Sequence, residues 1–207
     1  AGHGFERYGA KVVTVPSTKG RTQVDPDTLI QALRSHRPAL LHLSHAGFES
    51  AYLHELGPIA QACKESGTVF CLDAAQTGFI RPLSLKESGA DVILLQQHKW
   101  GCAATGAACI VATDAFIKHH DPALVGWMSH ARTFAFEKGP AKFGDNAWRF
   151  CGGTPDVPAK ARGAIAAELL VDTIGLERIQ AQNETLLAQL IEGVEGLGKP
   201  DLKAIHQ

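Results

Sequence analysis

The sequence predicts an α/β fold in which helices flank a mostly parallel sheet. Two observations support this prediction. Short apolar runs alternate along the chain with segments whose apolar residues recur at helical spacing. The apolar runs are continuous instead of alternating with polar residues, as expected for strands that are covered on both faces.

The expected elements follow one another regularly as far as residue 112. A helix begins at Pro26, because Asp25 is a favourable N-cap and proline is preferred at the first helical position. Further helices are predicted at residues 55–66 and 83–88 from their apolar spacing. Strands are predicted at residues 11–15, 39–43, 68–72, 91–95 and 107–112.

Beyond residue 114 the alternation stops. Residues 114–154 are rich in glycine, proline, histidine and aromatic residues, and loops of this length are usually functional or disordered. Two helices are predicted to close the chain, one at residues 159–173 and one from Leu176 onward, with Gly175 between them.

The composition excludes several classes of protein. The net charge is −1 and no basic cluster with interleaved aromatic residues occurs, so we expect no nucleic-acid partner. No apolar run approaches the roughly 20 residues that span a bilayer, and we expect no signal peptide before the first element. We therefore expect a cytoplasmic protein whose five cysteines are reduced and mostly in the core. No cysteine and histidine spacing is typical of a metal site, so no metal is expected.

Asp73 and Lys99 follow two successive predicted strands. Ligands bind beyond the carboxyl ends of the strands in an open α/β sheet, so both side chains can face one small molecule. A carboxylate for the pyridinium nitrogen and a lysine for the Schiff base are what pyridoxal 5′-phosphate (PLP) requires. We therefore predict PLP as the cofactor, with Lys99 catalytic and Gln76 bonded to the phenolic oxygen. A helix-cap or turn aspartate, a turn glutamine and a solvated surface lysine are the alternatives.

Several short motifs occur in an ordered set. They are Asp73-Ala74-Ala75-Gln76, Gly89-Ala90-Asp91, and His98-Lys99-Trp100 followed by Gly106. In this order they resemble the core of class V aminotransferases and cysteine desulfurases, which are PLP-dependent enzymes of fold type I. The resemblance implies that His98, beside Lys99, also contacts the cofactor.

A later pair of motifs looks most like the kynureninase branch of that superfamily. These motifs are Gly126-Trp127-x-x-His130 and Arg149-Phe150-x-x-Gly153-Thr154-Pro155. The resemblance implies a homodimer with shared active sites, in which Trp127 and Thr154 reach the cofactor phosphate of the neighbouring subunit. Gln76 departs from the histidine usual in kynureninases, which favours desulfurase-like or aminotransferase-like members.

The resemblance covers nearly the whole chain but only the middle of the family's length. Residues 1–157 are expected to form a partial PLP-binding large domain, and residues 158–207 the connecting helices and the start of the small C-terminal domain. The implied function is that of a segment of a PLP-dependent enzyme acting on an amino acid, kynureninase-like or class V aminotransferase-like. A cysteine desulfurase or C–S lyase, and a non-catalytic truncated relative, are the alternatives. We expect the 207 residues alone to be inactive.

Overall fold

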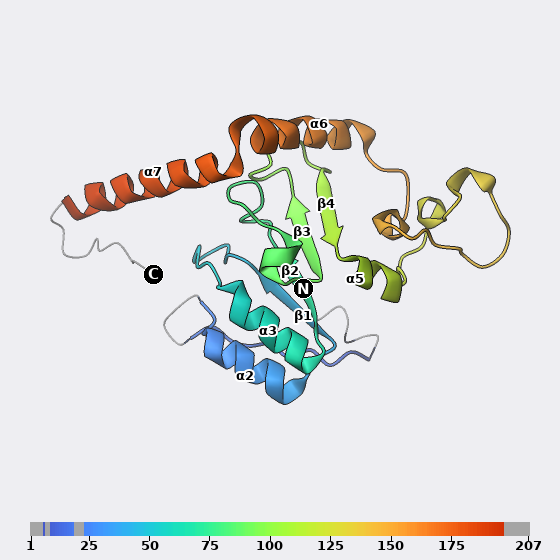
Figure 1. The fold of residues 1–207 in the computed structure, drawn as a ribbon, viewed down its shortest axis with the longest axis horizontal. Helices are drawn as coiled ribbons and strands as arrows, with labels where there is room; N and C mark the ends of the chain where they lie inside the picture. Colours follow the sequence, from blue (N-terminus) through green and yellow to red (C-terminus); the bar gives the residue numbers. More distant parts are fainter. Residues whose placement is uncertain (1–5, 7–8, 19–22, 197–207) are drawn as a thin grey trace.

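The computed structural model of the chain describes residues 6, 9–18 and 23–196, and its centre is a four-stranded sheet (Figure 1). The strands lie in the sheet in chain order. The first three are parallel, and the fourth runs antiparallel to the third. The predicted α/β fold with a mostly parallel sheet is therefore confirmed. The strands are β1 (Leu40–Ser44), β2 (Val69–Asp73), β3 (Val92–Gln96) and β4 (Ala108–Ala112).

The antiparallel direction of β4 follows from its short connection to β3. Residues 97–107 contain no helix, whereas a parallel neighbour needs a crossover of about a dozen residues or more. β4 also differs from the expectation that the strands are covered on both faces. Its Ile110 and Val111 are 49% and 41% exposed, because β4 forms an edge of the described sheet.

The strand predicted at residues 11–15 is wrong, because this part of the described chain forms no strand. Apolar β-branched residues favour a strand only where a neighbouring strand supplies the hydrogen bonds and the packing. Here Val15 packs instead against the hydrophobic core, while Val13 is exposed. Local composition was therefore not sufficient to make this segment part of the sheet.

Two helices pack together against the sheet, α2 (Pro26–His36) and α3 (Leu56–Ser66) (Figure 1). Asp25 caps α2 as predicted, since its carboxylate accepts the Thr28 N–H at 2.9 Å. Burial of each large apolar side chain in the core between these helices and the sheet contributes about 1.5–3 kcal/mol. The core includes Leu29, Leu33, Ile59, Cys63, Phe70, Leu72 and Ile93.

The short helix between β2 and β3 is α4 (Leu85–Ser88), which begins slightly later than the sequence predicts. Ser84 precedes the helix, and its hydroxyl accepts the Glu87 N–H at 3.1 Å. A serine in this role satisfies one of the unpaired N–H groups of the first turn. Gly89 ends the helix with a φ of 65°, which glycine adopts without the cost of a Cβ.

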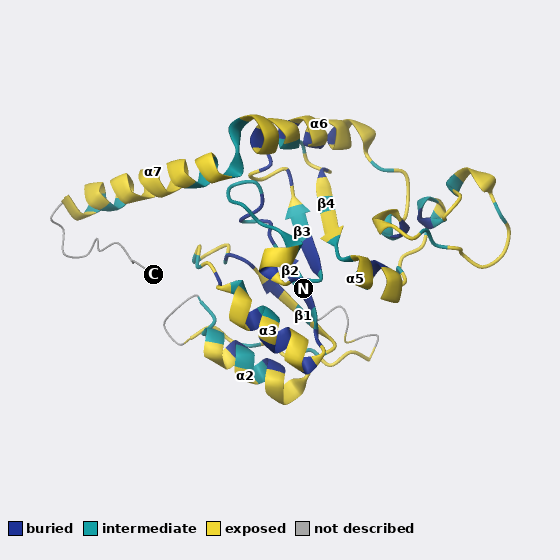
Figure 2. Ribbon diagram, viewed as in Figure 1, coloured by how far each residue is buried: buried dark blue, intermediate teal, exposed yellow. Residues whose placement is uncertain are grey.

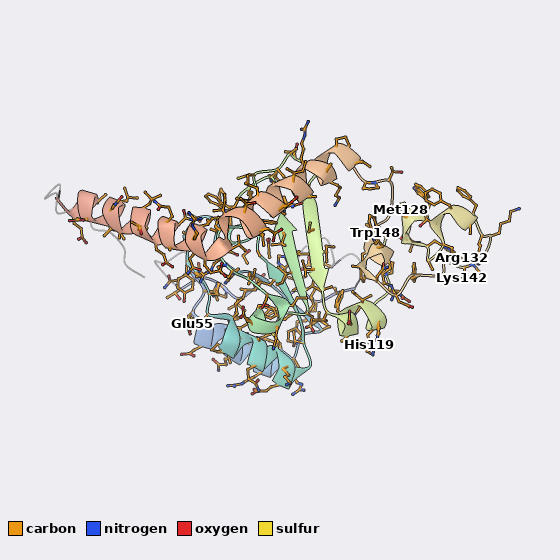
Figure 3. The ribbon with its side chains drawn as sticks, turned by 45° about the horizontal axis from the view of Figure 1, so that its top comes forward. Glu55, His119, Met128, Arg132, Lys142 and Trp148 are labelled. Carbon is orange, nitrogen blue, oxygen red and sulfur yellow. The ribbon has the colours of Figure 1, made fainter. Side chains whose placement is uncertain are left out.

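Residues 114–154 form a unit of short helices that extends beyond β4, away from α2 and α3 (Figure 1). Met128, Arg132, Lys142 and Trp148, labelled in Figure 3, all lie in this unit. Its helices are α5 (Asp114–His119), η1 (Trp127–Ser129), η2 (Thr133–Ala135) and η3 (Ala147–Phe150).

The buried side chain of Arg149 connects separate segments of this unit. Its guanidinium donates to the Ile117 carbonyl at 2.6 Å and pairs with the Asp121 carboxylate at 2.6 Å. The guanidinium carbon also lies 5.3 Å from the centre of the Phe143 ring. A guanidinium with several donors in a fixed fork can join separate loops in this way.

The chain continues into α6 (Val157–Ala167), the π-helical segment η4 (Glu168–Ile174) and α7 (Leu176–Gly196). No residue of α7 is buried, and Figure 2 shows this helix almost entirely as exposed surface. Leu186, Leu187 and Leu190 are between 51% and 63% exposed. The domain boundary at residues 157 and 158 stays a prediction. Among the described helices, none combines the length and the apolar character needed to cross a membrane.

Candidate active site

A cavity of about 200 Å³ opens at the carboxyl ends of β1 and β2. Its position follows from the register, because Ser44 at the end of β1 pairs with Asp73 at the end of β2. Ligands bind at this edge of an open α/β sheet. Three of the predicted site residues, Asp73, Gln76 and Lys99, line the cavity together. The other lining residues are Ser44, Ala46, Phe48 and Ala75.

The turn after β2 presents Asp73 and Gln76, both of which are half-buried. One oxygen of the Asp73 carboxylate accepts the Ala75 N–H at 2.9 Å, which orients the carboxylate on its own turn. The Thr77 N–H donates to the Ala74 carbonyl at 3.1 Å and closes the turn. The acid and the amide are therefore held on one short hydrogen-bonded element.

Exposed Lys99 lies in the turn that follows β3. Gln97 anchors this turn: its N–H donates to the Ala107 carbonyl at 3.1 Å, and its carbonyl accepts the Ala103 N–H at 3.0 Å. The buried Gln97 side chain also donates to the Gly163 carbonyl in α6 at 3.0 Å. These bonds tie the lysine-bearing turn to the residue before β4 and to α6.

Gly101 is expected to be essential for the shape of this turn. A Cβ at Gly101 would lie 2.7 Å from the Gln97 Cα and 2.8 Å from the Gln97 carbonyl oxygen. Gly101→Ala should therefore lower the free energy of unfolding by about 1–3 kcal/mol, because the backbone must move. Urea denaturation measures the change.

Gly57→Ala is the matched control for that substitution. Gly57 lies in α3, and a Cβ there meets no atom within 4 Å. Alanine is favoured over glycine inside a helix by roughly 0.5–1 kcal/mol, so this variant should be as stable as the parent or more stable. Equal stability of the Gly101→Ala and Gly57→Ala proteins would contradict the tight packing around Gly101.

Sequence reasoning missed three residues that come from the end of β1 and the segment after it. Ser44, Ala46 and Phe48 line the cavity, and Phe48 is 88% exposed. A signal for Ser44 was present, because it directly follows the strand predicted at residues 39–43, at the same edge as Asp73. Ala46 and Phe48 carried no such signal, since their place depends on how the segment folds back, with Ala46 bridged to Leu53.

Two buried histidines lie close to the cavity. His45 directly follows Ser44, and its Nδ1 lies 2.9 Å from the Thr77 hydroxyl. Burial, together with the nearby charges of Arg81 and His54, lowers the pKa of His45 to about 4. Burial also lowers the pKa of His54. Both imidazoles are therefore neutral at neutral pH.

The stability of the protein should decrease on mild acidification because of His45. Its pKa is about 4 in the folded chain and near 6.5 when exposed, so only the unfolded state takes up a proton between these values. Above pH 6.5 His45 has no effect, and from pH 7 to pH 5 it should remove about 2 kcal/mol of unfolding free energy. Urea denaturation at the two pH values measures the loss. A His45→Asn protein should lose correspondingly less, and an equal loss in both proteins would assign the effect to other groups.

The other predicted site residues do not line the cavity. His98 is exposed in the turn beside Lys99. Trp127 is 43% exposed in η1, with its ring 5.6 Å from that of Phe134, and Thr154 is also exposed. The Ser129 hydroxyl donates to the Cys151 carbonyl at 3.0 Å, so the segments that carry Trp127 and Thr154 lie together. The roles of these three residues stay predictions.

The cysteines show no clustering that suggests chemistry. All five have free thiols. Burial raises the pKa of Cys63 to about 11 and also raises that of Cys71, which keeps these thiols protonated. The core position expected for most of the cysteines is found only for Cys63, because Cys102 is exposed and the other three are half-buried. Within the described residues, no three cysteine, histidine or acidic side chains are grouped to hold a metal ion.

A larger hollow of about 390 Å³ lies between residues 16–18 and the start of α2. Among the described residues that line it, Asp25 is the one that carries a charge, and its carboxylate already caps α2 through Thr28. The side chains that line this hollow therefore offer little for catalysis. The smaller cavity, which combines a carboxylate, an amide and an amine, is therefore the candidate active site.

The side chains of that cavity fit PLP. The Asp73 carboxylate suits a protonated pyridine nitrogen, the Gln76 amide suits the phenolic oxygen, and the Lys99 amine suits the aldehyde. A mostly parallel α/β sheet with this set at its carboxyl edge defines the class of PLP-dependent enzymes of fold type I. The model of the aminotransferase class-V family matches residues 4–206, and the chain belongs to this family. Its cofactor is PLP, as the sequence resemblance implied.

Individual relatives match different shares of the chain. A probable cysteine desulfurase from Pyrococcus abyssi is 26% identical over 161 residues, which cover 78% of this chain and 39% of that protein. A kynureninase from Pseudomonas fluorescens is 26% identical over 113 residues, which cover 54% of this chain and 27% of that protein. The chain therefore spans well under half the length of these relatives.

Solved structures show the same fold. The apo structure of a cysteine desulfurase from Thermococcus onnurineus NA1 superposes with a TM-score of 0.79 at 22% identity, covering 95% of this chain and 47% of that one. A C-DES variant with glycine covalently linked to its PLP cofactor gives a TM-score of 0.75 at 22% identity, covering 92% of this chain and 51% of that one.

Proposed function

We propose that this chain is part of a PLP-dependent enzyme that breaks the C–S bond of an amino acid, as cysteine desulfurases do. The observation that carries the proposal is the cavity in which Asp73, Gln76 and Lys99 meet. The desulfurase from Pyrococcus abyssi matches a larger part of the chain than the kynureninase does. The comparisons thus support the desulfurase alternative better than the kynureninase-like interpretation from the later motifs.

The residues of the cavity have separate roles in the proposed reaction. When bound, PLP supplies an electron-withdrawing ring that stabilises negative charge at the Cα of an amino acid. The Asp73 carboxylate accepts a hydrogen bond from the ring nitrogen and keeps its proton in place. The Lys99 Nζ would hold the cofactor covalently, and once the amino group of a substrate has displaced it, the free Lys99 amine would take the Cα proton as general base. The Gln76 amide donates to the phenolic oxygen.

Reductive trapping tests the position of the covalent bond. The complete protein is loaded with PLP, reduced with borohydride, digested and mapped by mass spectrometry. The label is expected on Lys99, because it is the lysine that lines the cavity. A label on Lys64, Lys86 or Lys118 would remove the basis of the proposed function.

Product analysis tests the reaction branch separately. With cysteine and a thiol reductant, the loaded protein should release alanine and sulfide. Hydrolysis of kynurenine without sulfide release from cysteine would favour the kynureninase-like branch. Amino transfer from alanine to a keto acid would favour the aminotransferases. The trapping result is the same in all three cases, so this experiment decides the substrate class alone.

We further propose that the protein is a homodimer with shared sites, to which Trp127 and Thr154 contribute from the partner subunit. Their exposure and the joining of their segments through Ser129 support this arrangement. The prediction is tested by mixing a Lys99→Ala protein with a Trp127→Ala/Thr154→Val protein after subunit exchange. About a quarter of the parent activity should return, because half of the dimers are hybrids with one intact site. Recovery of no activity, with exchange demonstrated, would place each site within one subunit.

A further inference from the structure

His45 connects the two strand ends that form the cavity. It lies between Ser44 and Ala46, which both line the cavity, yet its own side chain is only 5% exposed. Its N–H donates to the Asp73 carbonyl at 2.9 Å, and its carbonyl accepts the His54 N–H at 3.0 Å. The backbone of His45 therefore continues the pairing of β1 and β2 as far as the site.

The His45 imidazole reaches the turn that carries Gln76. Its Nδ1 lies 2.9 Å from the hydroxyl of Thr77, and Thr77 is only 3% exposed. The Thr77 N–H donates to the Ala74 carbonyl, so the hydroxyl belongs to the residue that closes this turn. The pair thus links the segment after β1 to the turn after β2 by a side-chain bond.

This bond is shielded from water and from protonation. Burial, with the nearby charges of Arg81 and His54, lowers the pKa of His45 to about 4. The imidazole that faces the Thr77 hydroxyl is therefore neutral at neutral pH. Hydrogen bonds between fully buried partners are costly to break, because the abandoned donor or acceptor finds no water.

We propose that His45 is a positioning residue for the cofactor site, which acts through Thr77 to hold the Ala74–Thr77 turn and thereby the Asp73 carboxylate and the Gln76 amide. The inference rests on the proposed function, since Asp73 and Gln76 matter only if PLP occupies the cavity. His45 itself touches neither cofactor nor substrate in this role.

Equilibrium titration with PLP tests the role in the complete protein, with the absorbance maximum of the bound cofactor as a second readout. Asparagine places a polar atom near the position of Nδ1, whereas glutamine places it near that of Nε2. His45→Asn should keep the Kd for PLP within about threefold of the parent, while His45→Gln and His45→Leu should raise it by about tenfold or more. The absorbance maximum should shift in the two impaired proteins, because Asp73 and Gln76 contact the chromophore. A purely structural role would lower stability without such a shift.

Thr77 supplies the second pair of variants. Thr77→Val should reproduce the effects of His45→Leu, Thr77→Ser should behave like the parent, and the double variant should be no worse than either single one. If His45→Leu does not fold, the two Thr77 variants provide the test instead. Parent-like affinity and absorbance in His45→Leu or Thr77→Val, or equal impairment in His45→Asn and His45→Leu, would overturn the inference. Failure of the parent protein to bond PLP at Lys99 would instead overturn the proposed function.

Discussion

Lys99→Ala is expected to lower turnover by at least about 10³-fold, the largest effect of any single substitution in this chain. The variant loses both the covalent attachment of the cofactor and the amine that takes the Cα proton. Turnover is measured at saturating substrate and PLP, so that weaker cofactor binding does not dominate the result. The fold should persist, because the bonds that hold this turn come from backbone groups and from the side chain of Gln97, not from the Lys99 side chain.

Lys86→Ala is the matched control for the lysine. Lys86 is exposed on α4 and does not line the cavity, so its loss should leave turnover unchanged. A small primary amine added to the Lys99→Ala protein should restore part of the activity, because it can enter the space that the side chain leaves. Parent-like turnover of Lys99→Ala without added amine would refute the catalytic role.

Asp73→Asn should lower turnover by about 10²-fold or more, because the neutral amide no longer keeps the ring nitrogen protonated. The substitution is nearly isosteric. Its amide oxygen can still accept the Ala75 N–H, which lies 2.9 Å from the carboxylate in this structure. Binding of PLP should therefore be only partly weakened. Turnover and the Kd for PLP are measured together, and a loss confined to the Kd would contradict the role.

Two further variants separate charge from shape at this position. Asp73→Ala removes the bond to Ala75 as well as the charge, so it should also weaken PLP binding strongly. Asp114→Asn removes an exposed carboxylate at the start of α5 and should leave both quantities unchanged. Unchanged turnover in Asp73→Asn would remove the acid from the mechanism.

Most of the fold was predictable because its signals are local. Asp25 and Pro26 mark the start of α2, and the capping bond is observed there. The apolar runs at β1, β2 and β3 correspond to strands because buried backbone must be paired and the adjacent runs supply the partners. The run at residues 11–15 looks similar in sequence, but it finds no neighbouring strand in the described chain. Strand formation depends on a partner, and composition cannot supply that information.

The candidate site likewise combines residues that the sequence predicts with residues that only the tertiary structure brings together. The sequence alone placed Asp73, Gln76 and Lys99 after two predicted strands, because parallel strands deliver the residues that follow them to one edge. Only the tertiary structure brought Ala46 and Phe48 to the cavity and set His45 against Thr77. It also decided that Arg149 is buried in its own unit. These features depend on contacts between residues that are distant in the chain, whereas caps and apolar runs are determined by neighbours a few positions apart.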